Sequence, residues 1–250
     1  MCATVPSGSA ESATSPGAPP VPASELADEV LARLVLTYPK GADAERAGEM
    51  AAYMKGVAPF LGIMSTERRA LSRGVLAGLP RPGEADCAAV ALRCWRLPER
   101  EYHYFAVDYL RRYVRACSSA FLPVARHLVT TVSWWDTVDL LAGHVVGGLV
   151  AADPGLRRDM DRWIEDDDRW VARTALLHQL RFKDATDTER LFAYCLRQSG
   201  HPDFFIRKAV GWCLREYAKT DPDAVRAFVA DHADRLAPLS VREALKNVGA

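Results

Sequence analysis

Two tryptophans and two aspartates stand together in the segment Thr131-Val-Ser-Trp-Trp-Asp-Thr-Val-Asp139. If Ser133 caps a helix, Trp135 and Asp139 lie four residues apart on one helical face. An indole face attracts cations and a carboxylate stabilises positive charge, so this pair suits a reaction in which positive charge develops. The competing interpretation is structural, because tryptophans at a helix start usually pack against the core. Asp136 occupies the capping-box position behind Ser133, which assigns its carboxylate to backbone N–H groups.

A second segment, Phe204 to Lys219, carries cations around a tryptophan. One helical stripe, at spacings i, i+4, i+7 and i+11, consists of Lys208, Trp212, Arg215 and Lys219. Three cations make a poor core face, but they suit a phosphate backbone with an aromatic platform between the contacts. The alternative is that Trp212 lies at the edge of the core while the cations extend to solvent.

Arginines mark several further places. Arg169 and Arg173 are four residues apart at the start of an expected helix and could reach the same phosphate backbone. The acidic run 165–168 before them indicates a solvated helix end or loop. We expect three arginine pairs to be solvated surface: Arg68-Arg69, Arg111-Arg112 and Arg157-Arg158.

The elements that must position these residues are helices. Apolar residues recur at helical spacing from Glu25 onward. An aspartate before a proline indicates helix starts at Asp153-Pro154 and Asp221-Pro222. Further capping boxes begin at Thr186 and Ser240.

No alternating strand pattern or Asn-Gly hairpin interrupts these helices, so the sequence predicts an all-α fold. The start signals divide the chain into about a dozen helices of roughly 10 to 18 residues, and two helices per repeat give a period of about 40 residues, as in HEAT-type arrays. Stacked helix pairs form a curved solenoid whose concave face usually binds a partner.

Composition sets the domain boundary and narrows the class of protein. Residues 1–24 are almost all Pro, Ser, Ala and Gly, so we expect a disordered tail before one folded domain at 25–250. Hydrophobic residues make up 49% and charged residues 26% of the chain, which excludes a wholly disordered or collagen-like protein. Thirty-two basic residues balance 32 acidic ones, so any basic surface must come from placement rather than total charge.

The sequence indicates neither a metal centre nor a membrane anchor. The six cysteines form no Cys-x-x-Cys pair and the six histidines are scattered, so we expect reduced, mostly buried thiols and no metal or cofactor. The longest apolar stretch, 140–152, is too short to span a bilayer. The N-terminus has neither the basic start nor the apolar block of a secretory signal. We therefore expect a soluble, cytoplasmic protein.

Six segments in order make the chain similar to the DNA alkylation-repair glycosylase family of HEAT-like repeats, the AlkD type. They span about residues 25 to 245, while the N-terminal tail and the near-neutral charge depart from the family pattern. The segments are Ala52-Tyr-Met-Lys55, Phe60-Leu-Gly-Ile63 leading into Glu67-Arg-Arg69, Leu97-Pro-Glu-Arg-Glu101, Ser133-Trp-Trp-Asp-Thr-Val-Asp139, Trp170 to Arg173, and Phe204 to Lys219.

The resemblance implies roles for individual residues. Trp135 and Asp139 would be the catalytic pair, and Trp212 would share their aromatic cleft. Arg173 would contact DNA beside the site. The DNA-facing surface would include Tyr53, Lys55 and Arg215, and the stripe adds Lys208 and Lys219.

The resemblance also implies a chemistry. An N3- or N7-alkylated purine carries positive charge and leaves without a general acid, so a carboxylate need only stabilise the developing oxocarbenium ion and orient water. No lysine or metal is required, so we expect a monofunctional glycosylase acting on duplex DNA. The family leaves the lesion stacked rather than flipping it, and the preference between methyl and bulky adducts stays open.

Two other functions remain alternatives. The same fold could bind damaged or branched DNA without catalysis, in which case no base would be released. It could also serve as a protein-interaction scaffold, which would not bind duplex DNA at low salt. A monomer is the simplest expectation for a protein that must clasp a duplex.

Overall fold

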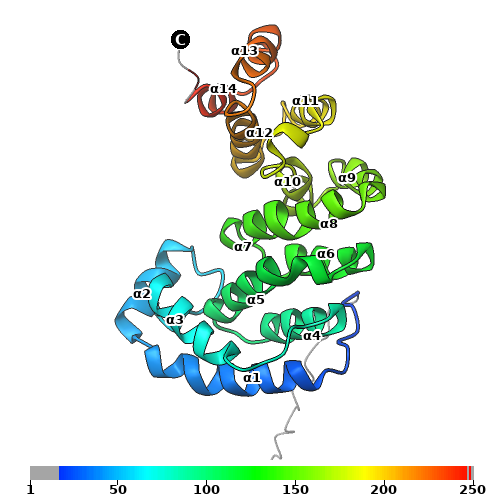
Figure 1. The fold of residues 1–250 in the computed structure, drawn as a ribbon. Coiled ribbons are helices and arrows are strands. Elements are labelled where there is room, and N and C mark those ends of the chain that lie inside the picture. Colours follow the sequence, from blue (N-terminus) through cyan, green and yellow to red (C-terminus); the bar gives the residue numbers. More distant parts are fainter. Residues whose placement is uncertain (1–16, 247, 249–250) are drawn as a thin grey trace, which may run out of the picture.

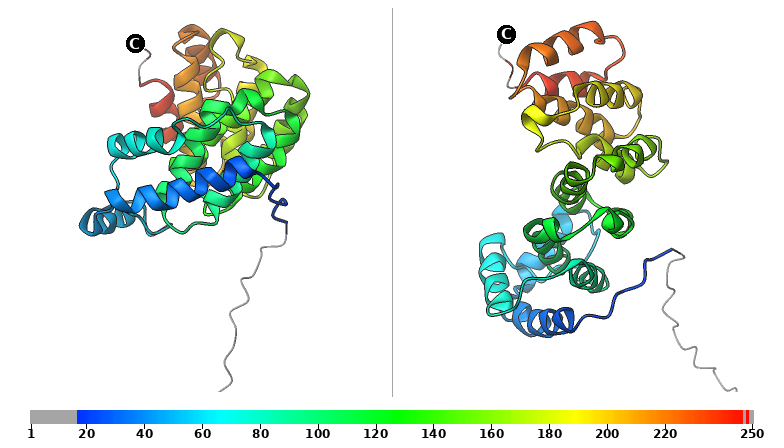
Figure 2. Two further views of the ribbon diagram at one scale, coloured as in Figure 1. Left: turned by 60° about the horizontal axis from the view of Figure 1, so that its bottom comes forward. Right: turned by 45° about the vertical axis from the view of Figure 1, so that its right-hand side comes forward.

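The computed structural model describes residues 17–246 and 248, and every regular element in that part of the chain is helical. Figure 1 shows the helices stacked in a curved array that begins with α1 and ends with α13 and α14. The two views in Figure 2 show the same curved path from other sides. The prediction of an all-α helical-repeat fold is confirmed.

The helices carry the labels of Figure 1. The α-helices are α1 (Glu25–Thr37), α2 (Ala44–Tyr53), α3 (Ser65–Leu76), α4 (Glu84–Trp95), α5 (Arg100–Tyr113), α6 (Leu122–Thr130), α7 (Trp135–Leu140), α8 (Gly147–Ala152), α9 (Arg157–Trp163), α10 (Arg169–Leu177), α11 (Thr188–Arg197), α12 (Phe204–Tyr217), α13 (Pro222–Asp231) and α14 (Pro238–Ala244). Shorter 3₁₀ segments are η1 (Tyr38–Gly41), η2 (Val114–Ala116), η3 (Ser119–Phe121), η5 (Pro154–Leu156) and η6 (Lys183–Ala185), and η4 (Leu141–Val146) is π-helical.

The second helices of successive pairs form an inner row. Helices α5, α7, α10, α12 and α14 contact one another in that order. Helices α4 and α6 pack behind the first two members of the row, and α9 and α11 pack against α10. The hydrophobic core runs without a break between these layers. Side chains at matching heights on the inner row therefore face one shared surface.

Aspartate side chains fix many of the helix starts. The predicted caps at Asp153 and Asp221 are confirmed, because each carboxylate accepts a backbone N–H near the following proline. The cap predicted at Thr186 is wrong, because Asp187 takes that position instead. The box predicted at Ser240 is also wrong: this serine lies inside α14, and its hydroxyl donates to the carbonyl of Arg207 at 2.8 Å.

The helix that carries Trp135 does not begin at the predicted cap. The Ser133 hydroxyl donates to the carbonyl of Val129 at 2.6 Å, so this side chain caps the end of the preceding helix, α6. The N-cap residue of α7 is Trp134 instead. Helices α7, η4 and α8 then follow without an intervening loop. The π-helical turn explains why α7 and α8 are each only 6 residues long, below the predicted range.

Residues just before the first helix are attached to the array. Helix α1 starts at Glu25, and the Ser24 hydroxyl accepts the N–H of Ala27 and donates to Asp86 at 2.6 Å. Val21 packs against the core. Most of the tail predicted to be disordered, residues 1–16, lies outside the described residues.

The described cysteines are all buried and unbridged, as expected, although the Sγ atoms of Cys195 and Cys213 lie 3.5 Å apart. Among residues 17–246 and 248, no three His, Cys, Asp or Glu side chains are grouped to hold a metal ion. In the same ranges, no helix combines the length and apolar character needed to cross a membrane.

Gly147 allows the close approach of α8 to the end of α10. A Cβ at this position would lie 2.2 Å from the carbonyl oxygen of His178. Gly147→Ala is expected to lower the free energy of unfolding by about 1–3 kcal/mol, because backbone atoms must shift. Gly74→Ala is the matched control: its Cβ meets nothing within 4 Å, so a gain of about 0.5–1 kcal/mol is expected from the helix preference of alanine. Denaturant titration of both variants measures the difference, and equal effects would contradict this account.

Candidate active site

An open cleft of about 450 Å³ crosses the inner row. Helix α2 borders it on one side and α12 on the other, with α7 and α10 between them. The predicted residues that line it are Tyr53, Trp135, Asp139, Arg173, Lys208, Trp212 and Arg215. Segments separated by more than a hundred residues in sequence therefore meet at one surface.

Asp139 and Arg173 form a buried ion pair at the base of this cleft. Arg173 Nε donates to Asp139 Oδ1 at 2.7 Å, and Nη2 donates to Oδ2 at 2.9 Å. The side chains are 12% and 4% exposed, so the pair is almost dehydrated. Burial raises the pKa of Asp139 above its usual range, and the negative charge of Asp136 acts in the same direction. The bonds from Arg173 oppose that rise and favour the carboxylate form of Asp139.

Arg173 is committed to contacts within the protein. Its remaining Nη1 group donates to the carbonyl of Phe205 at the start of α12. The predicted contact of Arg173 with DNA stays a prediction, and the geometry adds a second task, which is to orient the Asp139 carboxylate.

The walls of the cleft are aromatic. Trp135 and Trp212 are half-buried, while Phe204 and Tyr53 are exposed at its rim. A second cleft, of about 430 Å³, shares Trp135, Asp139 and Trp212 with the first and extends toward Tyr104 on α5. The carboxylate of Asp139 thus faces an elongated trough rather than a closed pocket.

Helix α14 pairs with the cationic stripe of α12. Glu243 accepts from Lys208 Nζ at 2.6 Å and from the Arg215 guanidinium. Gly211 lies between these cations on α12, and a Cβ there would meet the Cβ of Glu243 at 2.5 Å. Glu243 therefore fixes both cations and leaves this group with one net positive charge.

Two predicted DNA-binding lysines lie outside the cleft. Lys219 pairs with Glu216 at 2.7 Å and lines a separate pocket between α10 and α12. Lys55 is exposed in the turn after α2, where its backbone φ is 60°. Their contacts with DNA stay predictions that the cleft geometry does not support.

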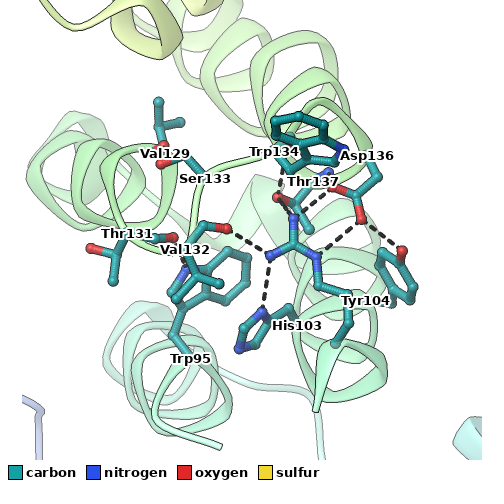
Figure 3. A network of polar contacts seen from close by, with 11 residues as sticks. Trp95, His103, Tyr104, Val129, Thr131, Val132, Ser133, Trp134, Asp136 and Thr137 are labelled. Carbon is teal, nitrogen blue, oxygen red and sulfur yellow. Dashed lines mark hydrogen bonds and ion pairs between the residues drawn. The ribbon is translucent and has the colours of Figure 1, made fainter. Parts of the chain in front are cut away.

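A buried polar network fixes the start of α7 (Figure 3). Arg100 is fully buried and donates from Nε to Asp136 Oδ2 at 3.0 Å and from Nη2 to Oδ1 at 2.6 Å. Tyr104 donates to the same Oδ2 at 2.6 Å. The assignment of Asp136 to a capping box is therefore wrong in its main part: only the N–H of Thr137 is a backbone partner, and the other partners are side chains of α5.

The remaining N–H groups of Arg100 also have partners. They reach His103 Nδ1 at 3.2 Å, the carbonyl of Val132 at 2.7 Å and Thr137 Oγ1 at 2.9 Å. Burial, followed by the charge of Arg100, lowers the pKa of His103 to about 4, so the ring is neutral and accepts from the guanidinium. Val132 has φ of 49°, which is strained for a β-branched residue, and its carbonyl is held there by Arg100.

A neighbouring carboxylate anchors the loop after α2. Glu101 is fully buried and accepts the backbone N–H groups of Leu61, Gly62 and Ile63 at 2.8–3.1 Å. The loop between α2 and α3 is thereby fixed to α5, which helps to hold Tyr53 at the rim of the cleft.

Several of these residues carry no role that the sequence predicts. Arg68 was expected to be solvated, but it is buried, pairs with Asp108 at 2.8 Å and covers the Tyr104 ring, so that prediction is wrong. Arg100 and Glu101 lie in a segment that carries the family resemblance, which was the available signal. No sequence signal pointed to Glu243, because it was interpreted as the acidic residue of the capping box that begins at Ser240.

Comparisons with known proteins agree on one group. A family model described as "DNA alkylation repair enzyme" matches residues 37–248. A solved structure, a predicted DNA alkylation repair enzyme from Enterococcus faecalis, is similar with a TM-score of 0.75 and 30% sequence identity. The match covers 83% of this chain and 97% of that one. A comparison with curated protein sequences finds no match.

The Arg100 network yields a stability prediction. Arg100→Met leaves the buried Asp136 without its cation, so the free energy of unfolding should fall by about 3–5 kcal/mol. The matched control is Arg226→Met, which removes an exposed pair with Asp223 on α13 and should change little. Urea titration followed by circular dichroism measures both variants. Similar losses in the two would show that the network does not stabilise the fold.

Proposed function

Because the chain belongs to the DNA alkylation repair enzyme family, we propose that it is a monofunctional DNA glycosylase. Its substrates would be cationic N3- or N7-alkylated purines in duplex DNA, released by hydrolysis of the N-glycosidic bond without base flipping. The observation that carries the proposal is the meeting of Trp135, Asp139 and Trp212 in one open cleft, with Arg173 holding the carboxylate. We further propose that the protein acts as a monomer in the cytoplasm.

The reaction asks little of the protein beyond charge and geometry. The alkylated purine is already positively charged and departs as a neutral base. Positive charge then moves to the deoxyribose, where Asp139 would stabilise it and orient the attacking water. A carboxylate has about four lone-pair sites, so the two bonds from Arg173 leave acceptor capacity on both oxygens.

The aromatic walls support the same chemistry. Trp135 and Trp212 would attract the cationic lesion and transition state, with about 0.5–2 kcal/mol from each ring. A trough that is open along its length needs no extruded base, and it leaves space beside the sugar for substituents of different size. This is why the proposal covers methyl and bulky adducts alike.

The cations around the cleft would bind the DNA backbone. Lys208 and Arg215 border the trough together with the exposed Tyr53 ring. Glu243 already holds the Lys208 and Arg215 side chains in place. Less side-chain entropy is therefore lost when they bind phosphate.

One observation favours the alternative of a non-catalytic DNA binder. Both oxygens of Asp139 are engaged by Arg173, which partly neutralises the charge that catalysis would need. The two functions differ in whether any base is released.

Asp139→Asn tests the catalytic assignment directly. The substrate is a duplex with one 7-methylguanine, and strand cleavage after alkali reports base release. The variant should bind this duplex but release base about 100- to 1,000-fold more slowly, because the neutral amide no longer stabilises the oxocarbenium ion.

The outcome separates three functions. Equal release by both proteins would remove Asp139 from the mechanism. Binding without release by the wild-type protein, also on a duplex with a bulky N3-alkyladenine, would establish the binder. Absence of duplex binding at low salt would contradict both and leave the scaffold.

Arg173 should set the acid limit of the reaction. Only the carboxylate form of Asp139 is active, so activity falls as pH drops through its pKa. Since Arg173 holds that pKa down against burial, Arg173→Met should raise the pKa and move the acid limb to higher pH. Arg173→Lys, which keeps the charge but loses the bidentate geometry, should fall between. Single-turnover rates on one substrate across pH measure the shift, and unchanged limbs in both variants would contradict this role.

A further inference from the structure

A set of exposed arginines lies beside the trough but outside it. Arg69 and Arg73 on α3, Arg112 on α5 and Arg181 just after α10 are exposed. Within residues 17–246 and 248, these four form no ion pair with a carboxylate. Arg111 also belongs to the set, although it shares Asp108 with Arg68. Uncompensated arginines on an otherwise charge-balanced protein need an anionic partner or solvent.

These arginines form a continuous row. Arg69, Arg73 and Arg112 line one cleft of about 250 Å³ between α3 and α5. His144 on η4 links the row to the next helix, because burial, followed by the charges of Arg111 and Arg181, lowers its pKa to about 4. The second cationic row, as we call Arg69, Arg73, Arg111, Arg112 and Arg181, therefore crosses α3, α5 and the end of α10.

The second cationic row shares its face with the trough. On α5, Tyr104 lines the trough, and Asp108 and Arg112 follow at four-residue intervals on the same face. Arg181 lies in the turn that follows α10. Tyr104 and Arg112 are eight residues apart on α5, so at about 1.5 Å per helical residue the row on α5 lies about 12 Å from the trough along the helix.

We propose that the second cationic row binds the phosphates of the strand opposite the lesion, across the minor groove. This inference rests on the proposed function. A minor groove about 6 Å wide, with the phosphate groups that border it, separates the two backbones by about 12 Å, the spacing between trough and row. The lesion strand then lies over Asp139 and its complement over the arginines.

Arginine is a residue type well suited to binding the phosphates of a DNA strand. Arginine binds phosphate through two N–H groups at once, and phosphate contacts fix register without reading sequence. The row also reconciles a net charge of zero with DNA binding, since the positive charge lies where a backbone would pass.

The test is a double variant, Arg112→Gln with Arg181→Gln. Its control is Arg157→Gln with Arg158→Gln, which removes the same charge from exposed arginines on α9. Binding of the wild type and both variants to a 7-methylguanine duplex is measured between 50 and 200 mM salt. Loss of two phosphate contacts should weaken binding about tenfold and reduce the slope of log K against log salt by about 1.8, whereas the control should match the wild type. Equal behaviour of the two double variants would overturn the proposal.

A second experiment identifies which DNA strand the second cationic row contacts. Duplexes carry uncharged methylphosphonate linkages in either the lesion strand or its complement. Neutral linkages in the complement should abolish the difference between wild type and the Arg112/Arg181 variant. If neutral linkages in the lesion strand abolish it instead, the strand assignment is wrong. Failure of the proposed function is distinct, because the wild type itself would then release no base.

Discussion

Helix α7 is held on both sides by dehydrated arginine–aspartate pairs, and the geometry of the trough depends on them. Arg100 of α5 binds Asp136 at the start of the helix, and Arg173 of α10 binds Asp139 one turn later. The two aspartates are three residues apart and lie on neighbouring parts of one helical face. Each pairs with a different flanking helix, and Trp135 lines the trough beside Asp139.

Buried pairs of this kind stabilise less than their Coulomb attraction suggests, because both charges lose water. Their contribution here is orientation. Arg100 uses all five N–H groups, so its guanidinium has one position, and the strained Val132 carbonyl is part of that position. An apolar replacement could pack as well, but it would not set the rotation of α7 about its own axis.

The sequence alone predicts much of this protein, for physical reasons that differ between fold and site. Helical periodicity and Asp-Pro starts are local, so the all-α array follows from them. The stripe on α12 and the spacing of Trp135 and Asp139 are also local, and the structure brings most of those residues to one cleft. Partner choice is not local. Nothing near Asp136 indicates that Arg100 rather than a backbone N–H will bind it, and Glu243 meets Lys208 only because Gly211 lets α14 approach.

The ion pairs of the inner row also have a mechanical meaning. The pairs of α7 join residues 36 and 34 positions apart, about one repeat, so they connect neighbouring repeats rather than parts of one. A solenoid bends by small rotations between repeats. Any rotation of α5 or α10 relative to α7 must lengthen one of these short bonds, so the curvature of the array and the direction of the Asp139 carboxylate change together. The curvature of the unbound array therefore sets the orientation of the Asp139 carboxylate.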